Sequence, residues 1–188
     1  MSINLSEISD IYLTYGSAQY GGEAVSQLQH ALQCASLAEN SGATSELICA
    51  ALLHDLGHLL RLPASEDMNE VKPAVDDLHQ YLVVPFLRGV VSEAVIEPIK
   101  LHVDAKKYLC AVDDTYWSSL SEASKNSLAL QGGAYSMQEA AEFILQPYAH
   151  DAVNLRRWDD MAKEPKATPP EWPHYLKLLD SVRLAASR

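Results

Sequence analysis

The most informative feature of this sequence is an adjacent His54-Asp55 pair inside a long apolar run that spans residues 47–62. An imidazole beside a carboxylate gives a metal ion two unlike ligands, and this combination of nitrogen and oxygen donors suits iron, manganese or zinc. The carboxylate can also reach a second ion, so the pair favours a two-metal centre buried among helices. The alternative is a core histidine beside a salt-bridged or helix-capping aspartate, with no metal.

Four histidines recur at nearly equal spacing along the chain. Intervals of 24, 25 and 23 residues separate His30, His54, His79 and His102. Each lies within or beside a segment of helical periodicity, so in an up-and-down bundle each helix could contribute one ligand to a common centre. This regular spacing favours the metal site over the packing alternative.

The order of these residues resembles the HD-domain superfamily, whose pattern is H…HD…H…H…D. The matching positions are His30, His54, Asp55, His79, His102 and an aspartate in the late string 155–160. Because all six positions are present, the chain resembles the dinuclear branch of the superfamily. This branch includes cyclic-dinucleotide phosphodiesterases and mixed-valent diiron oxygenases such as myo-inositol oxygenase. The resemblance implies an all-α fold in which residues 1–188 form a single HD-domain helical bundle.

Further matches resemble the small diiron oxygenases that cleave organophosphonates. They are the chain length, the string Tyr20-Gly21-Gly22-Glu23 before the first histidine, Lys106 four residues after His102, and Ser124 and Gln131 in the segment 121–133. This resemblance extends over nearly the whole chain. It implies two iron ions as Fe(II)/Fe(III), with O2 as co-substrate.

The same resemblance implies a ligand set in which Asp55 bridges the two irons. The first iron would be bound by His30, His54, Asp55 and Asp159, and the second by Asp55, His79 and His102. Asp160 competes with Asp159 for the last position, and spacing alone does not separate them. The family alignment, in register with Arg156, favours Asp159.

The resemblance also assigns catalytic roles to Tyr20 and His58. Tyr20 lies on a glycine-containing loop that can approach the metals, and it would occupy the open position on the second iron until substrate displaces it. Glu23 would pair with a cationic group of the substrate. His58, one turn beyond His54, is either a base or donor near the substrate or a histidine used for helix packing.

An acidic protein needs local cations to bind an anionic substrate. Lys106 lies one turn after a predicted metal-binding histidine, and Arg156 one turn before a predicted metal-binding aspartate, so both would point toward a phosphonate dianion. The alternative is that both are surface charges. The full predicted substrate-binding set is Glu23, His58, Lys106, Ser124, Gln131 and Arg156.

Composition is compatible with this interpretation and excludes other classes of partner. A net charge of -11 and a pI near 4.9 argue against a nucleic-acid partner. Cys34, Cys49 and Cys110 lie in apolar runs without paired spacing, so we expect reduced core residues rather than metal ligands. The N-terminus carries no basic-then-apolar signal, and no apolar stretch reaches the roughly 18 residues that span a bilayer. We therefore expect a cytoplasmic protein with no membrane partner.

Periodicity predicts helices along most of the chain. The expected ranges are 24–40, 46–60, 75–84, 92–101, 103–112, 137–146, a helix after Pro147 that carries Asp159, and about 174–186. Residues 61–73 are expected to form a surface loop, and Pro85 and Pro98 to separate helices. A glycine pair should end a short helix in segment 121–133, and Ser136 should open a helix with a capping box. No segment alternates long enough to predict a strand.

The resemblance implies a diiron oxygenase that cleaves the C–P bond of a 1-hydroxy-2-(amino or trimethylammonio)ethylphosphonate. O2 would be consumed, and the products would be phosphate with glycine or glycine betaine. A primary amine would pair with Glu23, whereas a trimethylammonium group would fit a cage of aromatic side chains. The aromatic residues considered for this cage are Tyr15, Tyr116, Trp117, Tyr135 and Trp158.

Two alternatives belong to other functional classes. A metal-dependent phosphohydrolase would use the same ligands to activate water against a small phosphate ester. A signalling or binding module would keep the HD fold without catalysis, although such modules usually lose ligands. The sequence gives no indication of the oligomeric state.

Overall fold

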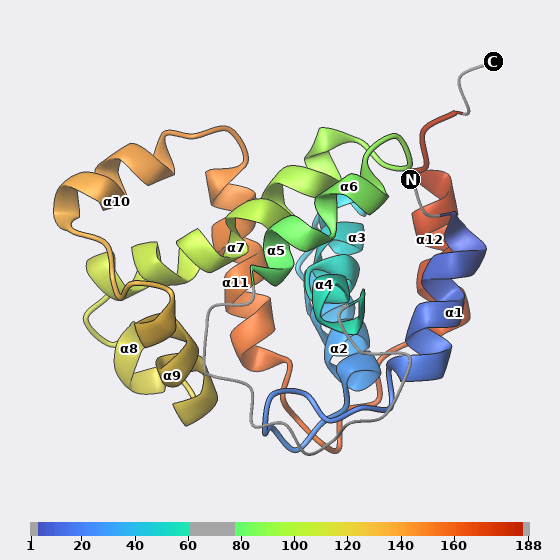
Figure 1. Cartoon of the computed structure of the whole chain (residues 1–188), viewed down its shortest axis with the longest axis horizontal. Coiled ribbons are helices and arrows are strands. Elements are labelled where there is room, and N and C mark those ends of the chain that lie inside the picture. Colours follow the sequence, from blue (N-terminus) through green and yellow to red (C-terminus); the bar gives the residue numbers. More distant parts are fainter. Residues whose placement is uncertain (1–3, 61–77, 186–188) are drawn as a thin grey trace.

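The computed structural model describes residues 4–60 and 78–185 (Figure 1). Every regular element in these two ranges is a helix, and the extended pairings within them are isolated bridges, which confirms the predicted all-α class. The helices are α1 (Leu5–Tyr15), α2 (Gln27–Asn40), α3 (Ser45–Leu53), α4 (Leu56–Leu60), α5 (His79–Leu82), α6 (Val84–Leu87), α7 (Glu93–Val112), α8 (Tyr116–Ser119), α9 (Glu122–Leu130), α10 (Met137–Ile144), α11 (Ala149–Met161) and α12 (Trp172–Ser181).

Four helices form the centre of the molecule and carry most of the site. α3 and α11 pack against each other and against both α2 and α7, and α7 extends from this centre toward α8 and α10. Figure 1 shows α1 and α12 side by side at one end of the molecule, with α8, α9 and α10 at the other end. The main hydrophobic core is continuous from α1 through α3 to α12.

The helix starts follow side-chain caps more closely than periodicity. α2 begins three residues later than predicted, because Ser26 accepts a hydrogen bond from the Gln29 backbone and the Gln29 side chain accepts one from the Ser26 backbone. α1 was not predicted, yet it opens with the same kind of capping box between Asn4 and Glu7. The capping box predicted at Ser136 is confirmed at the start of α10.

The helix predicted over residues 46–60 is interrupted at the His54-Asp55 pair. α3 ends at Leu53, α4 begins at Leu56, and a turn joins them. In one continuous helix, Asp55 would point about 100° away from His54. The turn removes this constraint, so both side chains can face the same centre.

Two prolines that were predicted to separate helices lie inside them. Pro98 lies within α7, which is one continuous helix rather than the two predicted. Proline removes one backbone donor, but the neighbouring Ile96 and Ile99 are buried and hold the helix against the core. Pro85 lies in the first turn of α6, where its missing N–H has no helical partner to lose. Residues 61–77, which include the predicted loop and the first part of the 75–84 helix, lie outside the described residues.

The C-terminal third follows the prediction more closely. α9 ends just before Gly132 and Gly133, which both have positive φ. α11 follows Pro147 and carries Asp159. α12 begins two residues earlier than predicted, because Pro173 occupies its first turn, and it ends at Ser181; residue 186 lies outside the described ranges.

The cysteines do not form a disulfide in the described part of the chain. Cys34 and Cys49 are buried and Cys110 is half-buried. Burial raises the pKa of the Cys49 thiol to about 12, so it stays protonated at neutral pH. Among the helices that the structure describes, none is long and apolar enough to cross a membrane.

Candidate metal centre

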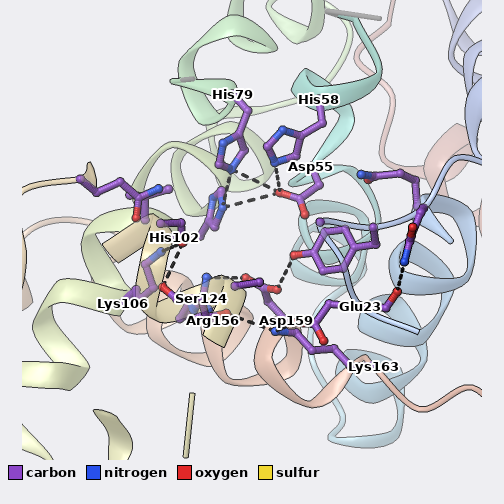
Figure 2. Close-up of a pocket in the computed structure, with 18 of the residues that line it drawn as sticks. Glu23, Asp55, His58, His79, His102, Lys106, Ser124, Arg156, Asp159 and Lys163 are labelled. Carbon is purple, nitrogen blue, oxygen red and sulfur yellow. Dashed lines mark hydrogen bonds and ion pairs between the residues drawn. The ribbon is translucent and has the colours of Figure 1, made fainter. Parts of the chain in front are cut away.

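Asp55 lies in the middle of a buried cluster of imidazoles and carboxylates (Figure 2). Its Oδ2 is 3.5 Å from His30 Nε2 and 3.3 Å from His54 Nε2. Asp159 on α11 places its Oδ1 3.3 Å from the same His30 nitrogen. These four side chains, His30, His54, Asp55 and Asp159, form a first donor group that could hold a metal ion.

The other carboxylate oxygen of Asp55 faces a second donor group, made by His58, His79 and His102. Asp55 Oδ1 lies 3.3 Å from His79 Nε2, 3.7 Å from His58 Nε2 and 3.9 Å from His102 Nε2. The Nε2 atoms of His79 and His102 are 3.1 Å apart. Asp55 therefore stands between two sets of nitrogen donors, which is the position required of a bridging carboxylate.

Backbone carbonyls orient the imidazoles of the first group. His30 Nδ1 lies 2.9 Å from the Ala162 carbonyl oxygen, and His54 Nδ1 lies 2.9 Å from that of Ala51. A carbonyl only accepts, so each Nδ1 donates, and in the neutral ring Nε2 carries a lone pair. The two Nε2 atoms face each other at 3.3 Å. They repel unless a proton or a metal ion lies between them, and carbonyl-oriented imidazoles are usual around metals.

Both carboxylates of the first group are ionised. Burial opposes ionisation of Asp55, but the imidazoles of His54 and His58 hold its pKa well below the ordinary value. Burial also opposes ionisation of Asp159, whose pKa is held well below the ordinary value by the Arg156 guanidinium. Oδ2 of Asp55 is buried and accepts no hydrogen bond. Buried polar atoms rarely lack a partner, and a metal ion would supply one.

The geometry separates Asp159 from Asp160. Asp160 belongs to neither donor group; it pairs with Arg156 and accepts a hydrogen bond from Tyr116. Asp159 instead directs Oδ1 toward His30 while its Oδ2 lies 2.6 Å from Arg156 Nη1. Asp159 is therefore the better placed of the two to act as a ligand, in agreement with the family alignment.

Tyr20 contacts two members of the first donor group, whereas its predicted position on the second iron stays a prediction. Its hydroxyl donates a hydrogen bond to Asp159 Oδ1 at 3.1 Å, and its ring stacks on His30 with centroids 3.7 Å apart. The Tyr20 N–H donates to the Val25 carbonyl oxygen, and this pairing holds the ring next to the start of α2. Burial, reinforced by Asp159, raises the pKa of Tyr20 well above its ordinary value, so the hydroxyl stays protonated.

A pocket of about 440 Å³ opens onto both donor groups. The substrate-binding residues predicted from sequence all line it: Glu23, His58, Lys106, Ser124, Gln131 and Arg156. His58 borders this pocket with 31% of its side chain exposed, and its ring stacks on that of His79. The prediction therefore selected residues from distant parts of the chain that do share one cavity.

Lys106 is a buried cation at the wall of this pocket. It is 2% exposed, and its Nζ donates a hydrogen bond to Ser127 Oγ at 2.8 Å. Burial, and then repulsion from Arg156, lowers the pKa of Lys106 to about 7. Its charge is thus poised near neutral pH, and an anion in the pocket would favour the protonated form.

Arg156 also borders the pocket, but its guanidinium already has partners. It pairs with Asp159 and Asp160, and its Nε donates to the Tyr116 hydroxyl at 3.1 Å. These contacts orient Asp159 and neutralise Arg156. The predicted role of Arg156 in binding the phosphonate stays a prediction, as does that of Lys106.

Glu23 has a partner, Lys163, that was not predicted from sequence. Lys163 Nζ lies 2.9 Å from Glu23 Oε1, and 3.2 Å from the hydroxyl oxygens of Ser121 and Ser124. Burial opposes ionisation of Glu23, but hydrogen bonds to Ser121 and Lys163 lower its pKa. One signal was available: Lys163 follows Asp159 by four residues, the same spacing by which Lys106 follows His102.

Comparison with known proteins supplies the family. No family model matches the chain. A protein of Gimesia maris named hydroxymethylphosphonate dioxygenase is 45% identical over 159 residues, which are 85% of this chain and 78% of that protein. A protein of Leisingera caerulea named 1-hydroxy-2-(trimethylamino)ethylphosphonate dioxygenase (glycine-betaine-forming) is 33% identical over 175 residues, 93% of this chain and 88% of that protein. The chain belongs to the phosphonate dioxygenase family.

Membership of the phosphonate dioxygenase family confirms the predicted oxygenase class. This class is consistent with the structure, in which buried histidines and aspartates form groups that could hold metal ions. The assignment to the HD-domain superfamily and the relation to myo-inositol oxygenase stay predictions.

The aromatic cage considered from sequence is not formed in this member of the phosphonate dioxygenase family. Trp158 packs in the hydrophobic core, Trp117 is 54% exposed, and the Tyr116 hydroxyl is bonded to Asp160 and Arg156. Tyr15 and Tyr135 do not line the pocket either. Among the described residues that line it, Tyr20 alone is a Tyr, Trp or Phe.

Proposed function

We propose that this chain is an iron-dependent oxygenase that breaks the C–P bond of a small 1-hydroxyalkylphosphonate. The balanced reaction is R–CH(OH)–PO3²⁻ + O2 → R–COO⁻ + HPO4²⁻ + H⁺, in which a C–H and the C–P bond break and O2 is reduced. The observation that carries the proposal is that the two oxygens of Asp55 face separate donor groups. Two irons held there would supply the redox chemistry with O2 and the Lewis acidity that the reaction needs.

The ligands would be divided in the way the resemblance implies. His30, His54 and Asp159 would bind one ion, His79 and His102 the other, and Asp55 both. These are nitrogen and oxygen donors only, which suits iron. Cys34 Sγ lies 3.6 Å from His30 Nε2, but burial raises the pKa of this thiol well above its ordinary value, so it is a poor ligand.

The pocket residues would bind and orient the substrate. Lys106, with the hydroxyl of Ser127 beside it, would bind the phosphonate, and Ser124 and Gln131 would offer further hydrogen bonds. His58 is the member of the second donor group that is not assigned as a ligand, and it borders the pocket, so it would accept the proton of the substrate hydroxyl. Tyr20 would keep Asp159 oriented and shield the first donor group from water.

The identity of the substituent R on the hydroxylated carbon is a separate question. The resemblance implies a cationic nitrogen there, with glycine or glycine betaine as the carbon product. The Leisingera caerulea relative is named for a trimethylamino substrate, which supports this, whereas the Gimesia maris relative is named for hydroxymethylphosphonate, which has no nitrogen. Both names support C–P cleavage, and they differ in this group.

The proposal is tested by loading the purified protein with iron under anaerobic conditions. It should bind about two irons per chain, because the donors form two groups joined by one carboxylate. The partly oxidised protein should show the EPR signal of a coupled mixed-valent pair and, on addition of O2, release phosphate from hydroxymethylphosphonate in step with O2 uptake. One tightly held zinc, no gain of activity with iron, and cleavage of phosphate esters without O2 would instead identify a phosphohydrolase.

A further inference from the structure

The charges around the pocket indicate what kind of substrate it accepts. Three carboxylates line it among the described residues, Glu23, Asp55 and Asp159. Asp55 faces the two donor groups, and Asp159 lies between His30 and Arg156. Glu23 is therefore the carboxylate that a cationic group on the substrate could reach, and Lys163 already occupies it.

Lys163 is held by more than this ion pair. Its Nζ also contacts Ser121 at the start of α9 and Ser124 in the first turn of that helix. Its side chain is 15% exposed and that of Glu23 17%, so the pair is mostly shielded from solvent. The preceding residue, Ala162, accepts a hydrogen bond from His30 through its carbonyl. Lys163 is thus fixed at both ends, in the wall of the substrate pocket.

We propose, on the basis of the function proposed above, that Lys163 is a specificity residue that selects hydroxyphosphonates without a cationic nitrogen, of which hydroxymethylphosphonate is the simplest. An ammonium group in the pocket would meet the Lys163 cation and would find no carboxylate free to pair with it. Burying such an uncompensated charge is strongly unfavourable. A phosphonate with an uncharged substituent avoids this repulsion and keeps the attraction of Lys106.

Size does not explain the same selectivity. A volume of 440 Å³ falls within the usual range for small-molecule pockets, so a 2-amino or 2-trimethylamino substituent is not excluded by volume. The absence of an aromatic cage among the described lining residues also removes the usual way to bind a quaternary ammonium without a carboxylate. The charges of Glu23 and Lys163 therefore determine which of these substrates the pocket prefers.

The test compares three substrates: hydroxymethylphosphonate, 1-hydroxy-2-aminoethylphosphonate and 1-hydroxy-2-(trimethylamino)ethylphosphonate. The wild-type protein should prefer the first over each of the others in kcat/KM by about tenfold or more, the scale of one unfavourable charge contact. Lys163→Gln removes the charge but can still donate hydrogen bonds to the serines. It frees Glu23 and should reduce this preference about tenfold.

Two further variants serve as controls. Lys163→Arg keeps the charge and should keep the preference, whereas Lys166→Gln changes an exposed lysine three residues away and should leave the preference unchanged. An equal or greater rate of the wild type on the amino substrates would overturn the proposal. So would a preference that Lys163→Gln leaves intact.

Binding separates failure of this inference from failure of the proposed function. The iron-loaded protein is titrated with the same three phosphonates without O2, so that no turnover is needed. If the phosphonates bind with hydroxymethylphosphonate the tightest, but none consumes O2, the proposed reaction fails and the selectivity stands. If O2 is consumed with an amino substrate preferred, the selectivity fails and the reaction stands.

Discussion

At the scale of single residues, Asp55 and His102 differ in how many donor groups they serve. Asp55 faces both groups, whereas His102 lies only in the second. We expect Asp55→Ala to lose both irons and His102→Ala to lose mainly one, because a bridging ligand contributes to two ions. Metal analysis of the two purified variants checks this. Equal iron retention in both would remove the bridging assignment.

The buried Lys106 gives phosphonate binding a defined dependence on pH. Its pKa of about 7 means that the binding cation is present below pH 7 and is lost as the pH rises through 7. Affinity for hydroxymethylphosphonate should therefore fall by up to about tenfold between pH 6 and pH 8, relative to Lys106→Arg, whose guanidinium stays charged.

Lys106→Arg is the reference in this experiment because the phosphonate itself also titrates. The second ionisation of the ligand affects both proteins equally and cancels in the ratio of their dissociation constants. Parallel pH profiles for wild type and Lys106→Arg would show that Lys106 does not carry the binding charge.

The metal-donor residues of this site can be predicted from residue type and spacing. The hydrogen-bond and ion-pair partners of the pocket residues cannot, because they depend on the fold. The histidines and Asp55 can be chosen from sequence because few side chains bind iron and their spacing is unusual. The salt bridge between Glu23 and Lys163 joins positions 140 residues apart. No local pattern encodes such a pair. From the sequence of its own loop, Glu23 was therefore predicted to pair with a cationic group of the substrate rather than with Lys163.

At the scale of elements, the short helix α4 must pass close to the start of α5. A Cβ added at Gly57 would lie 2.1 Å from the carbonyl oxygen of His79 and 2.8 Å from its carbonyl carbon. Alanine normally stabilises a helix by about 1 kcal/mol relative to glycine. Here backbone atoms block the methyl group, so the sign should reverse.

Gly57→Ala should therefore destabilise the fold by about 1–3 kcal/mol, the usual cost of overpacking. It should also weaken iron binding at the second donor group, because His79 must move with its backbone. Urea unfolding and iron content of the variant test the two effects. A variant as stable as the wild type, with full iron content, would show that α4 and α5 can separate without cost.

Two of the mispredicted elements are ones in which tertiary contacts override a local rule. Pro98 predicts a boundary from its missing donor, yet α7 continues because both flanking isoleucines are buried. The apolar run around His54 predicts one helix, yet the chain turns at Asp55. Capping boxes are local, and the one at Ser136 was predicted, whereas the equally local boxes that open α1 and α2 were missed.

At the scale of the whole molecule, the proposed ligands connect helices from all parts of the chain. His30 lies on α2, His79 begins α5, His102 lies on α7 and Asp159 on α11, with Asp55 at the turn after α3. In the unfolded chain these side chains are far apart, so the donor groups exist only in the folded state. Metal binding and folding are therefore linked.

This linkage predicts that iron raises the stability of the whole domain. An ion that binds only the folded state stabilises it by about 2.7 kcal/mol when its free concentration is 100 times the dissociation constant. For a chain of this length each kcal/mol corresponds to about 2–4 °C in Tm, so anaerobic iron addition should raise Tm by about 5–10 °C, and a chelator should reverse the change. Asp55→Ala is the matched control, because it lacks the shared ligand and its Tm should respond little to iron. If wild type and Asp55→Ala gained equally in Tm, the stabilising iron would be bound outside the two donor groups, and the centre would not connect the helices.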